Sequence, residues 1–175
     1  VEGSYGSIID TFTRDRTGHI QIHSEDYLDR PSLYKRIKNV DDIVARVEAV
    51  PGVLSAAPRV FAPSLAYAND KTSIASVIGI DPAAESATTS IAGKKRDGPF
   101  LDASRSGGRR ANQSPDGYDL VMIGQAIAKT LKIAIGDELV LIGQSVDGSI
   151  ANDIYIVSAI IGTKDGTERM NVYMT

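Results

Sequence analysis

Alternating apolar and polar positions predict the first elements of the chain. Residues Gly18–Ser24 alternate strictly, with isoleucines on one face and histidines and glutamine on the other, which predicts a half-buried strand. Asp41 and Asp42 precede an apolar stripe that ends at Pro51-Gly52. This pattern predicts a helix with an acidic N-cap and first turn.

The next segments favour strands followed by a second helix. Val53–Phe61 and Ser64–Ala68 are strand candidates, and their prolines favour edge or bent positions. Thr72–Ile80 is a better strand. Asp81-Pro82 begins a helix that runs toward Ile91, because proline suits the first helical position.

A glycine-rich segment, residues 92–118, interrupts this order. It holds six Lys or Arg residues against three Asp residues, so its charge is +3 in a chain of net charge −3. We predict a flexible surface loop, because the segment buries too little to offset its ordering entropy. A basic arm for anionic lipid headgroups or nucleic acid is the alternative, although no aromatic residues interleave with the charges.

The last third of the chain reads as a compact module. The sequence predicts a strand (Leu120–Ile123), a helix (Gln125–Leu131), a turn (Gly136-Asp137) and a strand (Leu139–Ile142). A hairpin loop (Ser145–Asn152) and two further strands (Asp153–Ile161 and Met170–Met174) follow. Ile127, Ala128 and Leu131 form the apolar face of the helix. Asp147-Gly148 is a strong turn pair, and the aliphatic run after Asp153 predicts burial on both faces.

Composition narrows the class of protein. The absence of cysteine excludes disulfide scaffolds, thiolate zinc sites and cysteine nucleophiles. A net charge of −3 gives no basic field for nucleic acid. No apolar run reaches the roughly 18–20 residues that span a bilayer. The chain begins at Val1, and we expect it to be a segment of a longer protein.

The side chains show no motif for chemistry. His19 and His23 would lie about 13 Å apart on a strand, too far for one zinc ion. Neither a serine elbow nor a phosphate-binding loop occurs, and Asn112-Gln113-Ser114 is a short glycosylation pattern. A pair of carboxylates brought together by tertiary contacts, acting as general acid and base, is an alternative that the sequence leaves open. We expect no catalytic residue, cofactor or metal site.

Five short motifs, in order, resemble the extracytoplasmic domains of FtsX-like ABC transporter permeases. The motifs are Gly18–Ile22, Val50–Val53 with Ala56–Arg59, Val77–Pro82 with Glu85, Ile123-Gly124 with Ala128 and Leu131, and Gly136-Asp137 with Val157 and Ile160–Gly162. The resemblance covers most of the chain except the basic insert. The first and third motifs are most similar to those of lipoprotein-releasing permeases.

The resemblance implies an α+β fold, the MacB-like periplasmic core, with a βαβ-type porter-like half and a small mostly-β subdomain. On that basis we expect a porter-like half over 1–91, a flexible basic insert over 92–118, and a β-rich subdomain over 119–175 that returns toward the first half. In the family this core lies between the first two transmembrane helices of a four-helix permease. Members continue past the strand at Val172–Met174, so this chain resembles a truncated domain.

The resemblance also implies a function without catalysis. We expect a periplasmic domain, in a permease of the inner membrane, that couples cytoplasmic ATP hydrolysis to export or extraction of a lipophilic or lipoprotein substrate. Its expected partners are the transmembrane segments of the same permease, a cytoplasmic ATPase subunit acting indirectly, a second permease copy or paralogue, and a periplasmic chaperone, lipoprotein or adaptor. The alternatives are a regulatory domain that activates a cell-wall hydrolase, and a hydrolase with a tertiary-assembled carboxylate site.

The predicted partner-contact site is the tip of the last hairpin. It consists of Ser145, Val146, Asp147, Gly148, Ser149 and Ile150. In the chaperone-recruiting family member the hairpin corresponding to Gln144–Asp153 is longer and protrudes. Here it is short and contains no proline.

Overall fold

A computed structural model describes residues 13, 18–32, 34–94, 96–102, 105–106, 109–110, 112–145, 147–162 and 166–175. The chain forms two compact units. Unit 1 comprises Val1–Pro58 and Ala83–Gly93, and unit 2 comprises Arg59–Pro82 and Lys94–Thr175. This division differs from the expected boundaries at residues 91 and 118, because the hairpin at residues 59–80 pairs with strands from the last third of the chain.

The regular elements in the described part of unit 1 are helices, and the rest of that part forms turns, bends and irregular structure. Unit 1 contains α2 (Val40–Glu48), most of α3 (Pro82–Thr88) and a short 3-10 helix, η2 (Ile91–Gly93). The predicted helix after residue 40 is confirmed, but its N-cap is Asn39, in a left-handed conformation, and Asp41 and Asp42 lie in the first turn. Both carboxylates still face the positive end of the helix dipole.

The strand predicted at Gly18–Ser24 is wrong. The backbone there forms bends and irregular structure, and the side chain of Ile20 is 81% exposed. Period-two alternation specifies which faces a strand would present, but a strand forms only where a neighbouring strand accepts its backbone hydrogen bonds. No such pairing is found for this segment among the residues that the structure describes.

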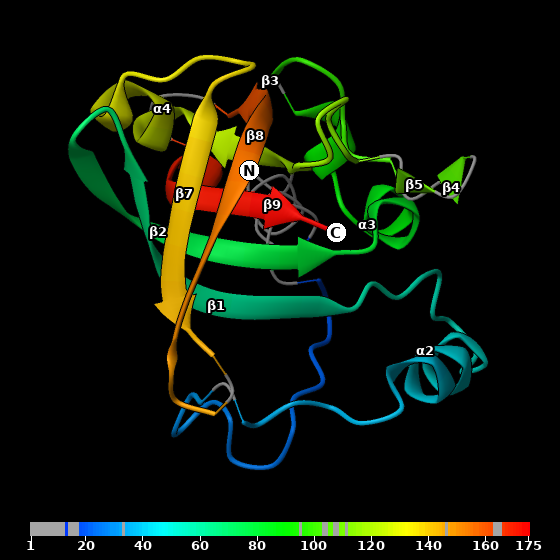
Figure 1. Cartoon of the computed structure of the whole chain (residues 1–175). Coiled ribbons are helices and arrows are strands. Elements are labelled where there is room, and N and C mark those ends of the chain that lie inside the picture. Colours follow the sequence, from blue (N-terminus) through cyan, green and yellow to red (C-terminus); the bar gives the residue numbers. More distant parts are fainter. Residues whose placement is uncertain are drawn as a thin grey trace, which may run out of the picture. The chain divides into compact units, whose positions relative to one another are not determined.

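Unit 2 is built on one large sheet (Figure 1). Its strands are β1 (Arg59–Ala68), β2 (Lys71–Ile80), β3 (Arg96–Asp97), β6 (Asp119–Gly124), β7 (Glu138–Gln144), β8 (Ile150–Ile161) and β9 (Asn171–Met174). They follow the order β3-β8-β6-β9-β2-β1-β7, and β7 also pairs with β8. That last pairing closes the sheet into a ring of strands, which leaves few exposed edges.

The first strand of this sheet corrects the sequence reading. β1 runs without a break through Pro63, whereas residues 53–58 form no strand. Pro63 lies opposite Ser76 of β2, and β7 pairs with β1 only from Ser64 to Tyr67. Proline lacks an N–H group and is therefore accommodated just outside the stretch that has neighbours on both sides. The strand predicted at Thr72–Ile80 is confirmed as β2.

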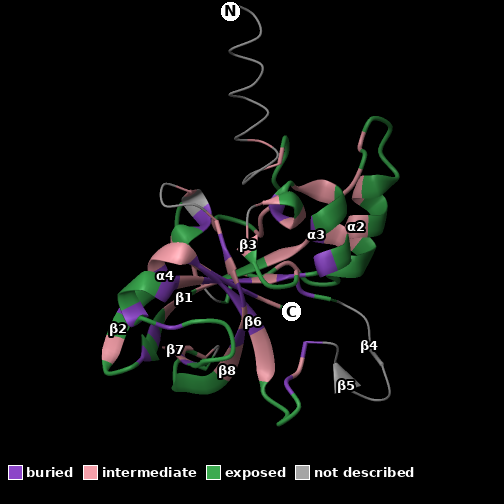
Figure 2. Ribbon diagram, turned by 90° about the horizontal axis from the view of Figure 1, so that it is seen from above, coloured by how far each residue is buried: buried purple, intermediate pink, exposed green. Residues whose placement is uncertain are grey.

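The core of unit 2 forms between the ring of strands and α4 (Gln125–Leu131). The predicted apolar face of this helix is confirmed, because Ile127, Ala128 and Leu131 are buried. Figure 2 shows buried residues gathered on β6 and on the strands around it. The core cluster consists of Ala66, Ala68, Ala75, Val77, Val121, Ile123, Ile127, Ala128, Leu131, Ile133, Leu139, Leu141, Val157 and Val172.

The basic segment is more ordered than the sequence suggested. β3, inside the segment, pairs with the end of β8, and Leu101 is buried. A second, two-stranded sheet joins β4 (Arg105–Ser106) to β5 (Arg109–Arg110). The segment predicted to be a flexible surface loop thus contains two short strand pairings and a buried side chain. The physical reason is that its few apolar and amide side chains are used as anchors.

The final strand occupies the middle of the sheet. A 3-10 helix, η3 (Thr167–Met170), leads into β9. β9 pairs in parallel with β2 and antiparallel with β6, so it has a neighbour on each side. None of the described helices is both long enough and apolar enough to cross a membrane.

Candidate functional site

The β7–β8 hairpin tip is a tight, internally bonded turn. Gln144 pairs with Ile150, so β8 begins two residues before the predicted end of the loop at Asn152. The Ser145 N–H donates to the Ser149 carbonyl at 2.8 Å, and the Gly148 N–H donates to the Ser145 carbonyl at 3.0 Å. Val146 lies outside the described residues. The described part of the tip is therefore a turn whose shape is fixed by its own backbone hydrogen bonds.

Asp147 fixes the shape of this tip. Its carboxylate accepts hydrogen bonds from the Ser149 hydroxyl at 2.6 Å and from the Ser149 N–H at 3.0 Å. The hydroxyl contact, followed by the backbone contact, lowers the pKa of Asp147 below its ordinary value. Ile150, the next residue, is 82% exposed. A large apolar side chain is thus presented to solvent on a turn that is already ordered.

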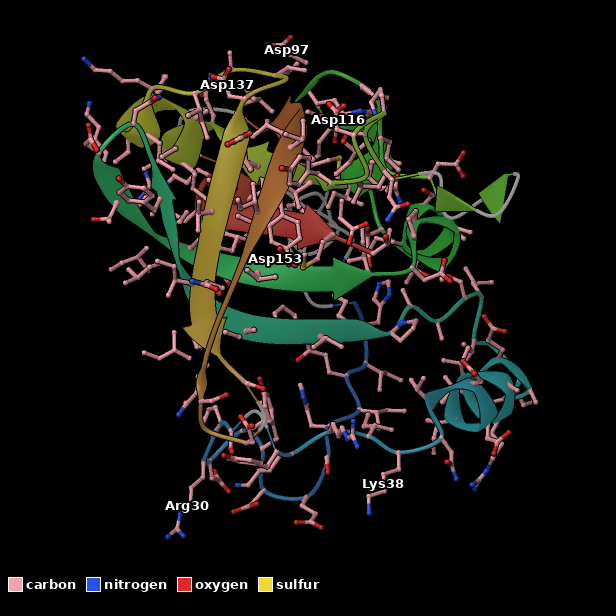
Figure 3. The ribbon with its side chains drawn as sticks, viewed as in Figure 1. Arg30, Lys38, Asp97, Asp116, Asp137 and Asp153 are labelled. Atoms are coloured by element: carbon pink, nitrogen blue, oxygen red, sulfur yellow. The ribbon has the colours of Figure 1, made fainter. Side chains whose placement is uncertain are left out.

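The two halves of β8 differ in burial. From Val157 onward, alternate residues of β8 are buried and the residues between them are half-buried, so one face is buried more fully than the other. Residues Ile150–Ile154 are all exposed. Burial on both faces was predicted from Asp153 onward, and it is wrong for Asp153 and Ile154. Figure 3 labels Asp153 on this exposed half of the strand. Its neighbour Ile154 belongs to the outer face, in register with Val140 of β7.

The Gly-Asp turn before β7 is confirmed and has a structural role. Gly136 has φ of 94°, a left-handed conformation that favours glycine. The Asp137 carboxylate accepts the Ala134 N–H at 2.8 Å. The Gly136 N–H donates to the Val157 carbonyl at 2.8 Å, and the Val157 N–H donates to the Asp137 carbonyl at 3.0 Å. These bonds attach the base of the hairpin to β8.

A shallow depression of about 290 Å³ lies beside this turn in unit 2. It is lined by Tyr67, Ala68, Asn69, Ile133, Asp137, Glu138 and Val140. The Asn69 amide donates to the carbonyls of Leu131 and Lys132 at 3.2 and 3.1 Å. The polar groups of Asn69 and Asp137 therefore serve the turn, and the geometry brings no nucleophile and base together in this wall.

The two histidines lie in the irregular segment of unit 1. The His23 ring stacks on Tyr27 with a centroid distance of 5.5 Å, and its Nε2 atom lies 3.2 Å from Gln21 Oε1. Within the described ranges no group of three or more His, Cys, Asp or Glu side chains could hold a metal ion. The stacked ring is a local packing contact.

Asn112, the first residue of the glycosylation pattern, is a buried clamp. Its Oδ1 atom accepts the Asp102 N–H at 2.9 Å, and its Nδ2 group donates to the Asp102 carbonyl. The same amide donates to Thr175 Oγ1 at 3.3 Å. A side chain that is 7% exposed and bonded in this way is not accessible for glycan transfer. Sequence reasoning missed this anchor, because asparagine is common in loops.

Glu168 is a second buried polar residue that sequence reasoning missed. Its carboxylate accepts a hydrogen bond from Lys94 at 3.0 Å, and both side chains are largely buried. A Cβ atom placed on Gly162 or Gly166 would meet the Glu168 side chain at 2.6 or 2.3 Å. The two glycines thus make room for this ion pair. The two glycines shortly before Glu168 are the signal that the sequence offers.

Taken together, the exposed features of unit 2 are an ordered hairpin tip and an apolar strand edge. The chain matches the MacB-like periplasmic core domain family over residues 1–175, and it belongs to that family. It is thus an extracytoplasmic domain of an ABC transporter permease, and the expected α+β fold class is confirmed.

Two solved structures are similar to this chain, and the first supports the fold. The chain is similar to the periplasmic region of MacB from Actinobacillus actinomycetemcomitans, with a TM-score of 0.50 and 14% sequence identity over 87% of this chain. The match covers 61% of that chain. The extracellular domain of the noncanonic ABC-type transporter YknZ from Gram-positive bacteria gives a TM-score of 0.47 and 12% identity, covering 87% of this chain and 68% of that one. A comparison with curated protein sequences gives no match.

Proposed function

We propose that this domain couples ATP-driven movement of its permease to the export or extraction of a lipophilic or lipoprotein substrate. The ATP is hydrolysed by a cytoplasmic ATPase subunit, and the transmembrane segments of the same permease carry the movement outward. A second permease copy or paralogue completes the assembly. In this proposal the domain itself is not an enzyme.

The observation that carries the proposal is the β7–β8 hairpin. Its base is bonded to β8 through the Gly136-Asp137 turn, and its tip is ordered by Asp147. Because β7 and β8 are joined by a hydrogen-bonded ladder from the base to the tip, movement of the sheet would carry the tip with it. The tip, from Ser145 to Ile150, is the surface that we assign to a periplasmic chaperone, lipoprotein or adaptor.

Charge substitution at the tip tests this role in the full-length permease with its ATPase subunit. Ile150→Glu places a carboxylate at an apolar position of the tip that is 82% exposed. Ile135→Glu is the matched control, because Ile135 is also exposed but lies outside the hairpin. We expect Ile150→Glu to slow cargo release from membrane vesicles about tenfold, the effect of losing about 1.4 kcal/mol of partner binding, with basal ATP hydrolysis unchanged.

Two results would contradict the proposal. Cargo release that responds equally to both substitutions would show that the tip has no special role. A photo-cross-linker at Ser149 that captures a cell-wall hydrolase, and no lipoprotein or chaperone, would instead support the regulatory alternative.

A further inference from the structure

Half of β8 has an open backbone edge. The Ser145–Ser149 bond at the tip and the Val157–Asp137 bond at the base place the odd-numbered residues of β8 toward β7. Backbone groups alternate in direction along a strand, so those of Ile150, Asn152 and Ile154 point away from β7. β6 pairs with β8 only from Tyr155 onward. In the described part of the chain, no strand pairs with this second edge of Ile150–Ile154.

An apolar band reaches this edge across the outer face of the sheet. Leu65 of β1 pairs with Ile74 of β2 and with Ile142 of β7. In the next row Tyr67 pairs with Val140, which pairs with Ile154 at the edge itself. Ile74 is 74% exposed, and Leu65 is 45% exposed. A contiguous exposed apolar surface of this kind is typical of an interaction site.

Asp153 partly blocks the open edge of β8. Its carboxylate accepts the Ile154 N–H at 2.8 Å, so one of the outward donors is held by a neighbouring side chain. Asp153 belongs to the opposite face of β8 from Ile150 and Ile154, because side chains alternate along a strand. An added strand would therefore meet isoleucines on one face and a carboxylate on the other.

We propose that the open edge of β8 binds an extended segment of a partner protein by strand addition. The occupant is a strand in which apolar residues alternate with Lys or Arg. Its apolar side chains continue the band beside Ile150 and Ile154, and a basic side chain pairs with Asp153. That pairing draws the carboxylate away and frees the Ile154 N–H for the new ladder.

Charge distinguishes this occupant from a second copy of the chain. A second β8 would bring another Asp153 carboxylate to the same face of the new strand pair, and like charges there repel. A basic segment gains attraction at the same positions. This surface does not depend on the proposed transport role, because peptide binding is measured without ATP or cargo.

The test uses the 175-residue chain and a short blocked peptide in which valine and lysine alternate. Binding is measured by fluorescence anisotropy, and amide hydrogen exchange of Asn152 and Ile154 is followed by NMR. We expect saturable binding with slowed exchange of both amides. Asn152→Pro removes an outward donor and should weaken binding about tenfold, the loss expected for one or two hydrogen bonds.

Charge reversal gives a second variant that leaves the backbone intact. Asp153→Lys should reject the valine-lysine peptide and bind a valine-glutamate peptide instead. Asp116→Lys is the matched control, because it makes the same change at an exposed position outside the sheet and should alter neither affinity. Thermal unfolding of each variant verifies that the fold is retained.

Three outcomes would overturn the proposal. One is that neither peptide binds the parent chain. Another is equal affinity of the valine-lysine peptide for the parent and for both edge variants. The third is dimerisation of the chain through the same edge, detected by sedimentation and abolished by Asn152→Pro, which would assign the edge to a second copy.

Discussion

The two halves of β8 belong to one strand but have opposite surroundings. Tyr155–Ile161 pairs with β6 and carries buried residues at alternate positions. Ile150–Ile154 pairs with β7 alone and is exposed throughout. The inner half supplies the free energy that holds the strand in place. The outer half can therefore keep apolar side chains and backbone groups available to a partner.

The largest expected effect on stability comes from making the same isoleucine-to-alanine substitution in each half of β8. Ile161→Ala should lower the free energy of unfolding by about 2–5 kcal/mol, because Ile161 is fully buried and the change leaves a cavity. Ile150→Ala should change it by less than about 0.5 kcal/mol. Urea denaturation of both variants measures the difference. Similar losses would mean that the outer half also contributes to the core.

A second contrast uses the glycines at the two ends of β8. Gly162 and Gly148 both have positive φ, at 94° and 87°. Gly162→Ala should lower the free energy of unfolding by about 2–4 kcal/mol. The new methyl group would clash with the buried Glu168 side chain, and alanine would be strained at this positive φ. Gly148→Ala, at the exposed tip, should show only the strain of about 1 kcal/mol. Equal shifts of the melting temperature would show that the Glu168 contact is not restrictive.

The smallest effect concerns Tyr155, which lies where the halves meet. Burial, with added contributions from Asp153 and Asp119, raises the pKa of its hydroxyl above the ordinary value. An acid with a raised folded-state pKa stabilises the fold below its unfolded pKa, about 10, and this stability is lost as pH rises through the folded value. Tyr155→Phe should flatten the alkaline decline in the free energy of unfolding. An unchanged decline would assign it to other groups.

The sequence predicted elements whose signals are local. The helix over Gln125–Leu131 was predicted with its observed boundaries and its observed buried face. Helix periodicity, the glycine before it and the turn after it act within a few residues. The same holds for the strand after Gly136-Asp137, whose turn geometry is set by its own residues.

Features that depend on distant partners could not be predicted. The alternation at Gly18–Ser24 formed no strand, while Pro63 lies inside one, because pairing partners decide both cases. An isoleucine on an exposed sheet face has the same pattern as one in a core, so Ile154 was predicted to be buried although it is exposed. Asn112 and Glu168 acquire their roles only from residues far away in the chain.

The position of β9 also sets the order in which the ring of strands is completed. β9 joins β2 to β6, and Ser76 pairs with Asn171. β9 follows the other strands of the sheet in the sequence, so it is synthesised after them. Until β9 is present, β2 and β6 lack the strand that connects them. Long-range pairing of this kind slows folding. We expect ring closure by β9 to be the final step of folding, and the sheet to have two open edges, on β2 and β6, until then.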